Sequence, residues 1–189
     1  MAPPIYTDDE PSPDQSVIYR RFGMHAEVAD THHRAGLASP RTRSRYSQIL
    51  EGIALKWREP ATVHHRSGDV VEWFSGPDAV AADGWPRLQI GHERDAPVIG
   101  ECVSFNRRAY DLHVRWRLDE DVLDELGEWL RKPHRLSIGF EELVPPDAVG
   151  MSFDGLPQVR QRLVAVDHCA IVVKGAYPGA RTLPLPLAD

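Results

Sequence analysis

Three polar side chains in otherwise apolar segments are of the types used in nucleophilic catalysis. They are His92 in LQIGHERDAPVIG, Ser137 in HRLSIGF and His168 in AVDHCAIVV. A serine that attacks a carbonyl group needs a base to take its proton, and the base needs a third group that holds its tautomer and stabilises its charge. A second histidine can be that third group, although a neutral imidazole offers no full charge. Taken alone, each of these residue types is more often structural than catalytic, and sequence spacing does not show that the three meet.

Other catalytic and metal-binding chemistries lack the motifs that they need. The chain has no Gly-rich phosphate loop and no GxSxG nucleophile elbow, which argues against an α/β-hydrolase. Nine histidines suggest metal binding, yet HExxH and CxxC spacings do not occur. The pairs His32/His33 and His64/His65 are expected in loops, and adjacent histidines on a strand would point to opposite faces. We therefore predict no metal site.

Composition indicates a soluble globular protein. The 189 residues are 42% hydrophobic and 26% charged, and the net charge of −6 argues against a general nucleic-acid binder. The chain has no apolar run of membrane-spanning length, and its first residues do not resemble a secretory signal. Cys102 and Cys169 lie in apolar runs and are interpreted as buried thiols in a reducing compartment. These features predict a cytoplasmic protein that does not bind membranes.

The chain divides into an arm, a domain and a short tail. Residues 1–46 are rich in Pro, Asp, Ser and Arg, and we expect a largely disordered N-terminal arm. Its basic stretch THHRAGLASPRTRSRY could be a solvated linker or could dock on an acidic partner. Residues 47–183 form the predicted domain, and residues 184–189 are a C-terminal tail.

Hydrophobic periodicity within the domain predicts many strands and few helices. In the first strand, Ile53, Leu55 and Trp57 share a face. In HRLSIGF, Leu136, Ile138 and Phe140 should face the core, with Ser137 and Gly139 on the opposite face. In DLHVRWRL, the apolar residues Leu112, Val114, Trp116 and Leu118 alternate with His113, Arg115 and Arg117. Strands are expected at 49–57, 68–74, 98–105, 111–118, 135–143 and 159–175, a helix at 119–131, and a turn-rich loop at 145–157. The predicted fold is mainly β with a few helices (α+β), as an antiparallel barrel or sandwich.

Several of these segments, in order, carry motifs of one protein family. LEGIALKW is followed by GDVVEWFSGPDAV and then by GHERDAPVIG, in which Val98 interrupts a Pro-Ile-Gly sequence. A hairpin and a helix then lead to an intact Ser-Ile-Gly-Phe box at 137–140, and the last block is VDHCAIVVKGAYPGAR. Over residues 50–181 this series resembles the prohead maturation proteases of tailed phages, which are similar to the herpesvirus assemblin proteases. The last block departs from the Pro-Ala-Asn-Pro turn of that family.

The resemblance implies a catalytic triad and a fold. It identifies Ser137 as the nucleophile, His92 as general base and then acid, and His168 as the group that orients His92. Asp167 should face the other way on its strand. The implied fold is an assemblin-like antiparallel β-barrel flanked by helices, and the activity is endopeptidase cleavage through an acyl-enzyme. Backbone amides near Lys174 and Gly175 are oxyanion-hole candidates, although an ordinary glycine turn explains them equally well. Arg160 and Arg162 either lie near the site or form a solvated face.

The resemblance also implies partners and a location. Substrates would be phage scaffold protein or the scaffolding segment of the major capsid protein, inside an immature head in the host cytoplasm. No cofactor, nucleic acid or membrane is needed, and a homodimer is expected by analogy with the herpesvirus enzymes. Because no long heptad helix follows the domain, the scaffold should be a separate product.

Two alternative functions remain open on the sequence. One is a capsid-assembly protein that keeps the fold and has lost catalysis, which a large separation between the Ser137 hydroxyl and both imidazoles would favour. The other is an unrelated β-barrel binding module whose histidines belong to its core.

Overall fold

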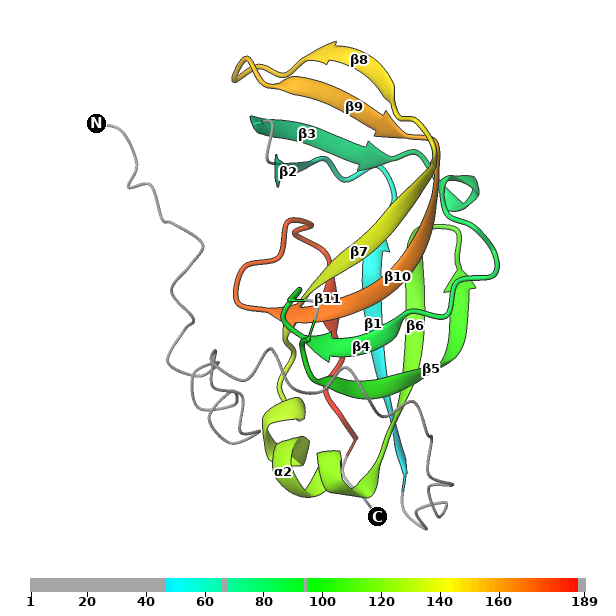
Figure 1. The fold of residues 1–189 in the computed structure, drawn as a ribbon, viewed down its shortest axis with the longest axis vertical. Helices are drawn as coiled ribbons and strands as arrows, with labels where there is room; N and C mark the ends of the chain where they lie inside the picture. Colours follow the sequence, from blue (N-terminus) through cyan, green and yellow to red (C-terminus); the bar gives the residue numbers. More distant parts are fainter. Residues whose placement is uncertain (1–46, 66–67, 94, 187–189) are drawn as a thin grey trace, which may run out of the picture. The chain divides into compact units, whose positions relative to one another are not determined.

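The domain is mainly β, as predicted, and is built on a closed barrel. The computed structural model describes residues 47–65, 68–93 and 95–186, so the predicted arm at 1–46 and the His32/His33 pair lie outside the described residues. Seven strands form the barrel in the order β1-β11-β7-β10-β4-β5-β6, and β6 closes it on β1 (Figure 1). Its neighbouring strands are antiparallel except β4 and β10. The barrel strands are β1 (Gln48–Lys56), β4 (Arg87–Ile90), β5 (Val98–Arg107), β6 (Asp111–Leu118), β7 (Arg135–Val144), β10 (Leu163–Val172) and β11 (Arg181–Thr182).

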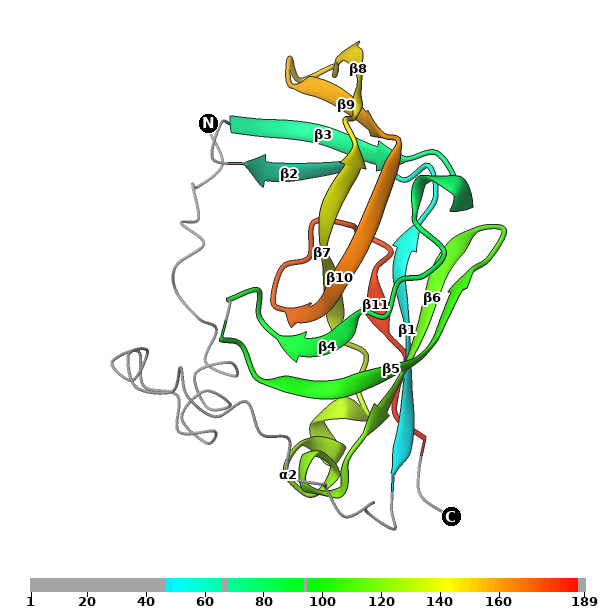
Figure 2. The same ribbon diagram turned by 45° about the vertical axis from the view of Figure 1, so that its right-hand side comes forward.

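A second sheet of four strands lies at one end of the barrel, and the helix lies at the other (Figure 2). This sheet has the order β2-β3-β9-β8. Its strands are β2 (Ala61–His65), β3 (Gly68–Phe74), β8 (Asp147–Met151) and β9 (Pro157–Gln161), and a 3-10 turn, η1 (Pro77–Ala79), follows β3. The helix is α2 (Glu120–Leu130), close to the predicted range of 119–131, with Asp119 at its N-cap position. Among the described residues, no helix is long and apolar enough to cross a bilayer.

The barrel core consists of alternate residues on most strands, as half-buried sheets require. Leu112, Val114, Trp116 and Leu118 of β6 are buried, and Trp116 donates its indole N–H to the Pro86 carbonyl at 2.8 Å. The prediction for β1 was wrong in part. Leu50 and Ala54 face inward while Ile53 is only half-buried, because a register shift between Ile53 and Leu55 changes the alternation. Beyond that shift Leu55 and Trp57 are buried as expected.

Three predicted segments have a different local structure. His64 and His65, expected in a loop, are the last residues of β2, which pairs with β3. The strand expected at 159–175 is two strands, since β9 ends at Gln161 and β10 begins at Leu163, and the two belong to different sheets. The loop expected at 145–157 contains β8, which pairs with β9. The tail expected from residue 184 begins with ordered packing, because Leu185 is buried and its amide donates to the Leu130 carbonyl of α2 at 3.0 Å.

Candidate active site

Two of the three predicted catalytic residues form a direct hydrogen bond. Nδ1 of His92 lies 2.9 Å from Nε2 of His168, with the two rings inclined at 63°. His168 belongs to β10, and His92 follows β4, which pairs with β10 in parallel. The amide of Gly91 donates to the Ile171 carbonyl at 3.0 Å, so the turn that carries His92 is attached to β10. The strand pairing therefore brings together two histidines that are 76 residues apart.

A third residue extends this pair, and the sequence prediction for it was wrong. Oδ2 of the exposed Asp167 lies 3.0 Å from Nδ1 of His168, although strict alternation predicts that neighbouring residues face opposite ways. The β7–β10 register shifts between Val166 and His168, which makes Asp167 the extra residue of a β-bulge. Val166 and Cys169 are both buried on the core side, so Asp167 and His168 both face outward.

The hydrogen bonds assign a tautomer to each ring. A carboxylate can only accept hydrogen bonds, so Nδ1 of a neutral His168 carries the proton that it shares with Asp167. Nε2 of His168 is then an acceptor, and it receives the N–H at Nδ1 of His92. Nε2 of His92 is left with an unprotonated lone pair. This arrangement is the one that a histidine needs in order to act as a general base.

Gly139 determines where the His168 ring lies relative to Ser137. A Cβ atom on Gly139 would lie 2.1 Å from Cε1 of His168, so the imidazole covers the Cα of this glycine. Gly139 is paired with His168, and Ser137 is paired with Ala170, two residues along each strand. Ser137 is therefore a diagonal cross-strand neighbour of His168 on the same face, at a typical Cα separation of about 7–8 Å. Leu136 and Ile138 are buried on the opposite side, as the sequence predicts.

The Ser137 hydroxyl is near the histidine pair but is not bonded to it. Among the described residues, no hydrogen bond joins it to either imidazole. His168 and Gly139 line an open depression of about 520 Å³ between β7 and β10, and Ser137 and His92 are not among its lining residues. The full lining is Gly139, Phe140, Glu141, Ala165, Val166, Asp167 and His168.

The candidate oxyanion-hole segment lies next to the residue that precedes Ser137. A Cβ atom on Gly175 would lie 2.5 Å from the carbonyl oxygen of Leu136, a separation that only glycine permits. Among the turn and loop hydrogen bonds between described residues, none uses the amide of Lys174 or Gly175 as its donor. The segment is thus packed close to the nucleophile candidate and has backbone donors to offer.

The two arginines that the sequence placed either near the site or on a solvated face are exposed. Arg160 belongs to β9 of the second sheet, and Arg162 lies between β9 and β10. Nη2 of Arg160 lies 2.6 Å from Oδ2 of Asp147, and Nε of Arg162 lies 3.7 Å from Oδ1 of the same carboxylate. Because the chain passes from β9 to β10 at Arg162, neither arginine shares a strand with His168. Within the described ranges, no group of three or more His, Cys, Asp or Glu side chains could hold a metal ion.

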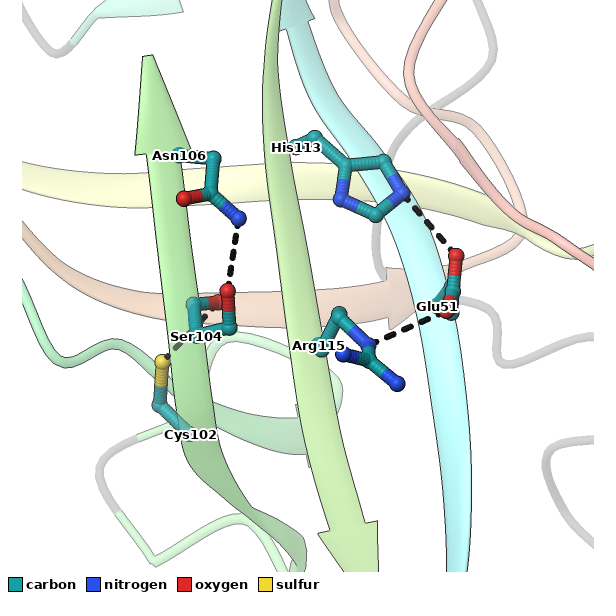
Figure 3. A network of polar contacts seen from close by, with 6 residues as sticks. All are labelled: Glu51, Cys102, Ser104, Asn106, His113 and Arg115. Atoms are coloured by element: carbon teal, nitrogen blue, oxygen red, sulfur yellow. Dashed lines mark hydrogen bonds and ion pairs between the residues drawn. The ribbon is translucent and has the colours of Figure 1, made fainter.

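A second histidine network lies on β1, β5 and β6 (Figure 3). Nε2 of His113 lies 3.2 Å from Glu51, which also pairs with Arg115 at 3.0 Å. The nearby Ser104 hydroxyl instead accepts a hydrogen bond from Asn106 at 2.6 Å. His113 is only 2% exposed, and burial lowers its pKa and favours the neutral ring. A substrate cannot reach this imidazole, so we interpret the network as structural.

The electrostatics of His92 predict an acid limb in any activity that uses it as a base. Although the residue is exposed, protein atoms around the ring displace part of its water, which lowers its pKa below the ordinary value of 6.5. Nearby His168 lowers the pKa further, and Glu93 raises it in part. The neutral ring therefore persists below pH 6.5, and kcat/KM should rise with pH through an apparent midpoint below that value.

Two measurements check this expectation. The pH profile of kcat/KM gives the midpoint, and an NMR titration of the His92 ring gives its pKa without any need for activity. A midpoint at or above 6.5, the ordinary value for a histidine, would contradict the assignment of His92 as the base.

Comparison with known proteins adds no relative. Neither a scan against models of protein families nor a search of curated proteins found a match for this chain.

Proposed function

We propose that the protein is a serine endopeptidase. The observation that supports this most is the chain of hydrogen bonds from Asp167 through His168 to His92, which leaves Nε2 of His92 as a base on the face that carries Ser137. Asp167 is then a fourth member of the catalytic group, added to the predicted triad of Ser137, His92 and His168. Its role is to orient His168. The exposure of His92 and the adjoining depression allow a peptide to approach.

The proposed reaction proceeds through an acyl-enzyme. As Oγ of Ser137 bonds to the scissile carbonyl carbon, its proton passes to Nε2 of His92 and the carbonyl oxygen becomes an oxyanion. Amides at Lys174 and Gly175 would donate to that oxygen. When the carbon–nitrogen bond breaks, His92 gives its proton to the leaving amine. A water molecule, deprotonated by His92, then cleaves the ester and restores the serine.

The substrate class follows from the family resemblance. Prohead maturation proteases act on scaffold protein or on scaffolding segments of the capsid protein, and the Ser-Ile-Gly-Phe box here carries Ser137 and Gly139. We therefore propose cleavage of scaffold inside an immature phage head in the host cytoplasm, by a homodimer and without a cofactor. The likeness of the seven-stranded barrel to the assemblin barrel is part of this proposal.

One observation favours a second candidate, a capsid-assembly protein that has lost catalysis. It is the lack of a hydrogen bond between the Ser137 hydroxyl and an imidazole among the described residues. Contacts to a catalytic base are often long without substrate and tighten in the reacting complex, so this observation does not outweigh the oriented histidine pair.

Covalent labelling separates the two candidates. A fluorophosphonate reacts with a serine whose hydroxyl is activated by a base, and it mimics the tetrahedral intermediate. We expect one adduct by intact mass, located at Ser137 by peptide mapping. Ser104, which is also half-buried but bonded to Asn106, is the internal control and should stay unlabelled. Absence of an adduct at Ser137 across the pH range in which His92 is neutral would favour the inactive protein.

A further inference from the structure

The segment 173–180, between β10 and β11, is attached to β7 at both ends. Near its start Gly175 packs on the Leu136 carbonyl oxygen, where a Cβ atom would lie only 2.5 Å away. At its end the Ala180 carbonyl accepts a hydrogen bond from the Leu136 amide at 3.2 Å. Both contacts involve the residue immediately before Ser137. The position of this segment therefore decides where the amides of Lys174 and Gly175 lie relative to the nucleophile candidate.

A buried tyrosine holds the middle of the segment. Tyr177 is 3% exposed, and its ring packs edge-on against Phe74 of β3 with 5.8 Å between the ring centroids. Its hydroxyl donates a hydrogen bond to Oε1 of Glu72, which also belongs to β3. Burial and the adjacent Glu72 carboxylate raise the pKa of Tyr177, so the hydroxyl remains a donor at physiological pH. The second sheet thus reaches the candidate oxyanion segment through one side chain.

Burial of the Glu72 carboxyl group costs free energy. Glu72 is 1% exposed, and among the described residues it forms no ion pair with a lysine or arginine. Its other oxygen accepts a hydrogen bond from Nε2 of Gln161 at 3.0 Å, and the same nitrogen lies 3.2 Å from Oε1 of Glu142 on β7. Oε1 of Gln161 is buried without a hydrogen-bond partner in the described structure.

An apolar pair would fill the same space at a lower cost in free energy. A buried polar network differs from apolar packing because it is satisfied at one arrangement only, whereas apolar packing tolerates small shifts. The cost is therefore best explained by a need to hold segment 173–180 at one position. Catalysis has that need, because an oxyanion donor stabilises the developing charge only at hydrogen-bond distance.

We propose that Glu72 and Tyr177 form a clamp that positions the Lys174 and Gly175 amides as oxyanion donors beside Ser137. This inference rests on the proposed protease function. Both are positioning residues, because they act through the backbone of segment 173–180 and touch no reacting atom.

Removal of one oxygen atom tests the clamp. Tyr177→Phe keeps the ring on Phe74 and loses the hydrogen bond to Glu72. We expect kcat to fall by about 10- to 100-fold with KM changed by less than about twofold, because the donors act on the transition state. Glu72→Gln, made with Tyr177 intact, keeps an amide oxygen that can accept from the Tyr177 hydroxyl, so it should retain most of the wild-type kcat. Tyr110→Phe, at an exposed tyrosine outside the clamp, is the matched control and should match the wild type.

Amide hydrogen exchange gives a second measurement that needs no activity. In Tyr177→Phe the amides of Leu136 and Ala180, which donate hydrogen bonds to the Ala180 and Tyr177 carbonyls, should exchange faster, while those of β10 should keep wild-type protection. Unchanged exchange at Leu136 and Ala180 would overturn the clamp even in an active protease, and so would a rise in KM at constant kcat. If the wild-type protein neither cleaves peptide nor takes a fluorophosphonate at Ser137, the protease proposal fails. Faster exchange in Tyr177→Phe would then show that the clamp orders the segment but does not serve catalysis, which would overturn its assignment to an oxyanion hole.

Discussion

Ser137→Ala is expected to abolish processing of head proteins. In serine proteases the loss of the nucleophile costs roughly 10⁴-fold or more in kcat, because the remaining site can only bind and polarise the substrate. The measurement is the fate of scaffold and capsid protein co-expressed with the variant, followed by mass spectrometry of the products. Because the Ser137 hydroxyl makes no hydrogen bond among the described residues, the free energy of unfolding should change by only about 0.5 kcal/mol or less.

Ser104→Ala is the control for this experiment. It removes a hydroxyl from the structural network of Figure 3, where Ser104 accepts from Asn106, and it should leave processing unchanged. If head proteins are still cleaved at the wild-type rate by Ser137→Ala, then Ser137 is not the nucleophile and the proposed mechanism is wrong.

Gly139→Ala is expected to have the second largest effect, although it removes no reactive atom. The new methyl carbon would lie 2.1 Å from Cε1 of His168, far inside van der Waals contact, and the two other nearest ring atoms would lie at 2.6 Å. The imidazole must move, and its hydrogen bond to Nδ1 of His92 must break or lengthen. Because displacements of about 1 Å in a catalytic group can cost 10²-fold, we expect kcat to fall by roughly 10² or more.

A double-mutant cycle isolates this mechanism from a general loss of stability. In a His168→Ala background the ring is absent, so Gly139→Ala should cost little further activity, and the two effects should be strongly non-additive. Gly127→Ala is the matched control, because no atom outside its own helix lies within 4 Å of the added methyl group. That variant should gain about 1 kcal/mol of stability from helix propensity. Wild-type activity in Gly139→Ala would exclude His168 from the mechanism.

Alternation along single strands predicted much of the geometry on β7 and β6. It correctly placed Leu136 and Ile138 in the core and the four apolar residues of β6 inside the barrel, because these strands keep their period of two where the core needs it. Phe140, expected on the same face as Leu136, is only half-buried. It failed for Ile53 on β1 and for Asp167 on β10, since both strands contain a register shift. A bulge leaves no signature in the residue types here, so strict alternation assigned the wrong face to each.

The contacts between distant segments could not be obtained from the sequence. The hydrogen bond between His92 and His168 depends on the parallel pairing of β4 and β10, which no local pattern reveals. The burial of Glu72 also depends on contacts between distant segments. Its place in the sequence indicates the polar face of a half-exposed strand, whereas in the structure it is buried beside Tyr177 and Gln161. The only sequence feature that associates Gly139 with the site is its position two residues after Ser137 in the Ser-Ile-Gly-Phe box.

The bulge at Asp167 changes which alternate residues of β10 face the core. Before it the inward residues are Val164 and Val166, and after it they are Cys169 and Ile171, so the inward set moves from even to odd numbers. The loss of one residue here would not shorten a loop. It would leave either the paired core residues or His168 on the wrong side of the sheet. The length of β10 between Val166 and Cys169 is therefore a constraint on the chemistry of the site as much as on the fold.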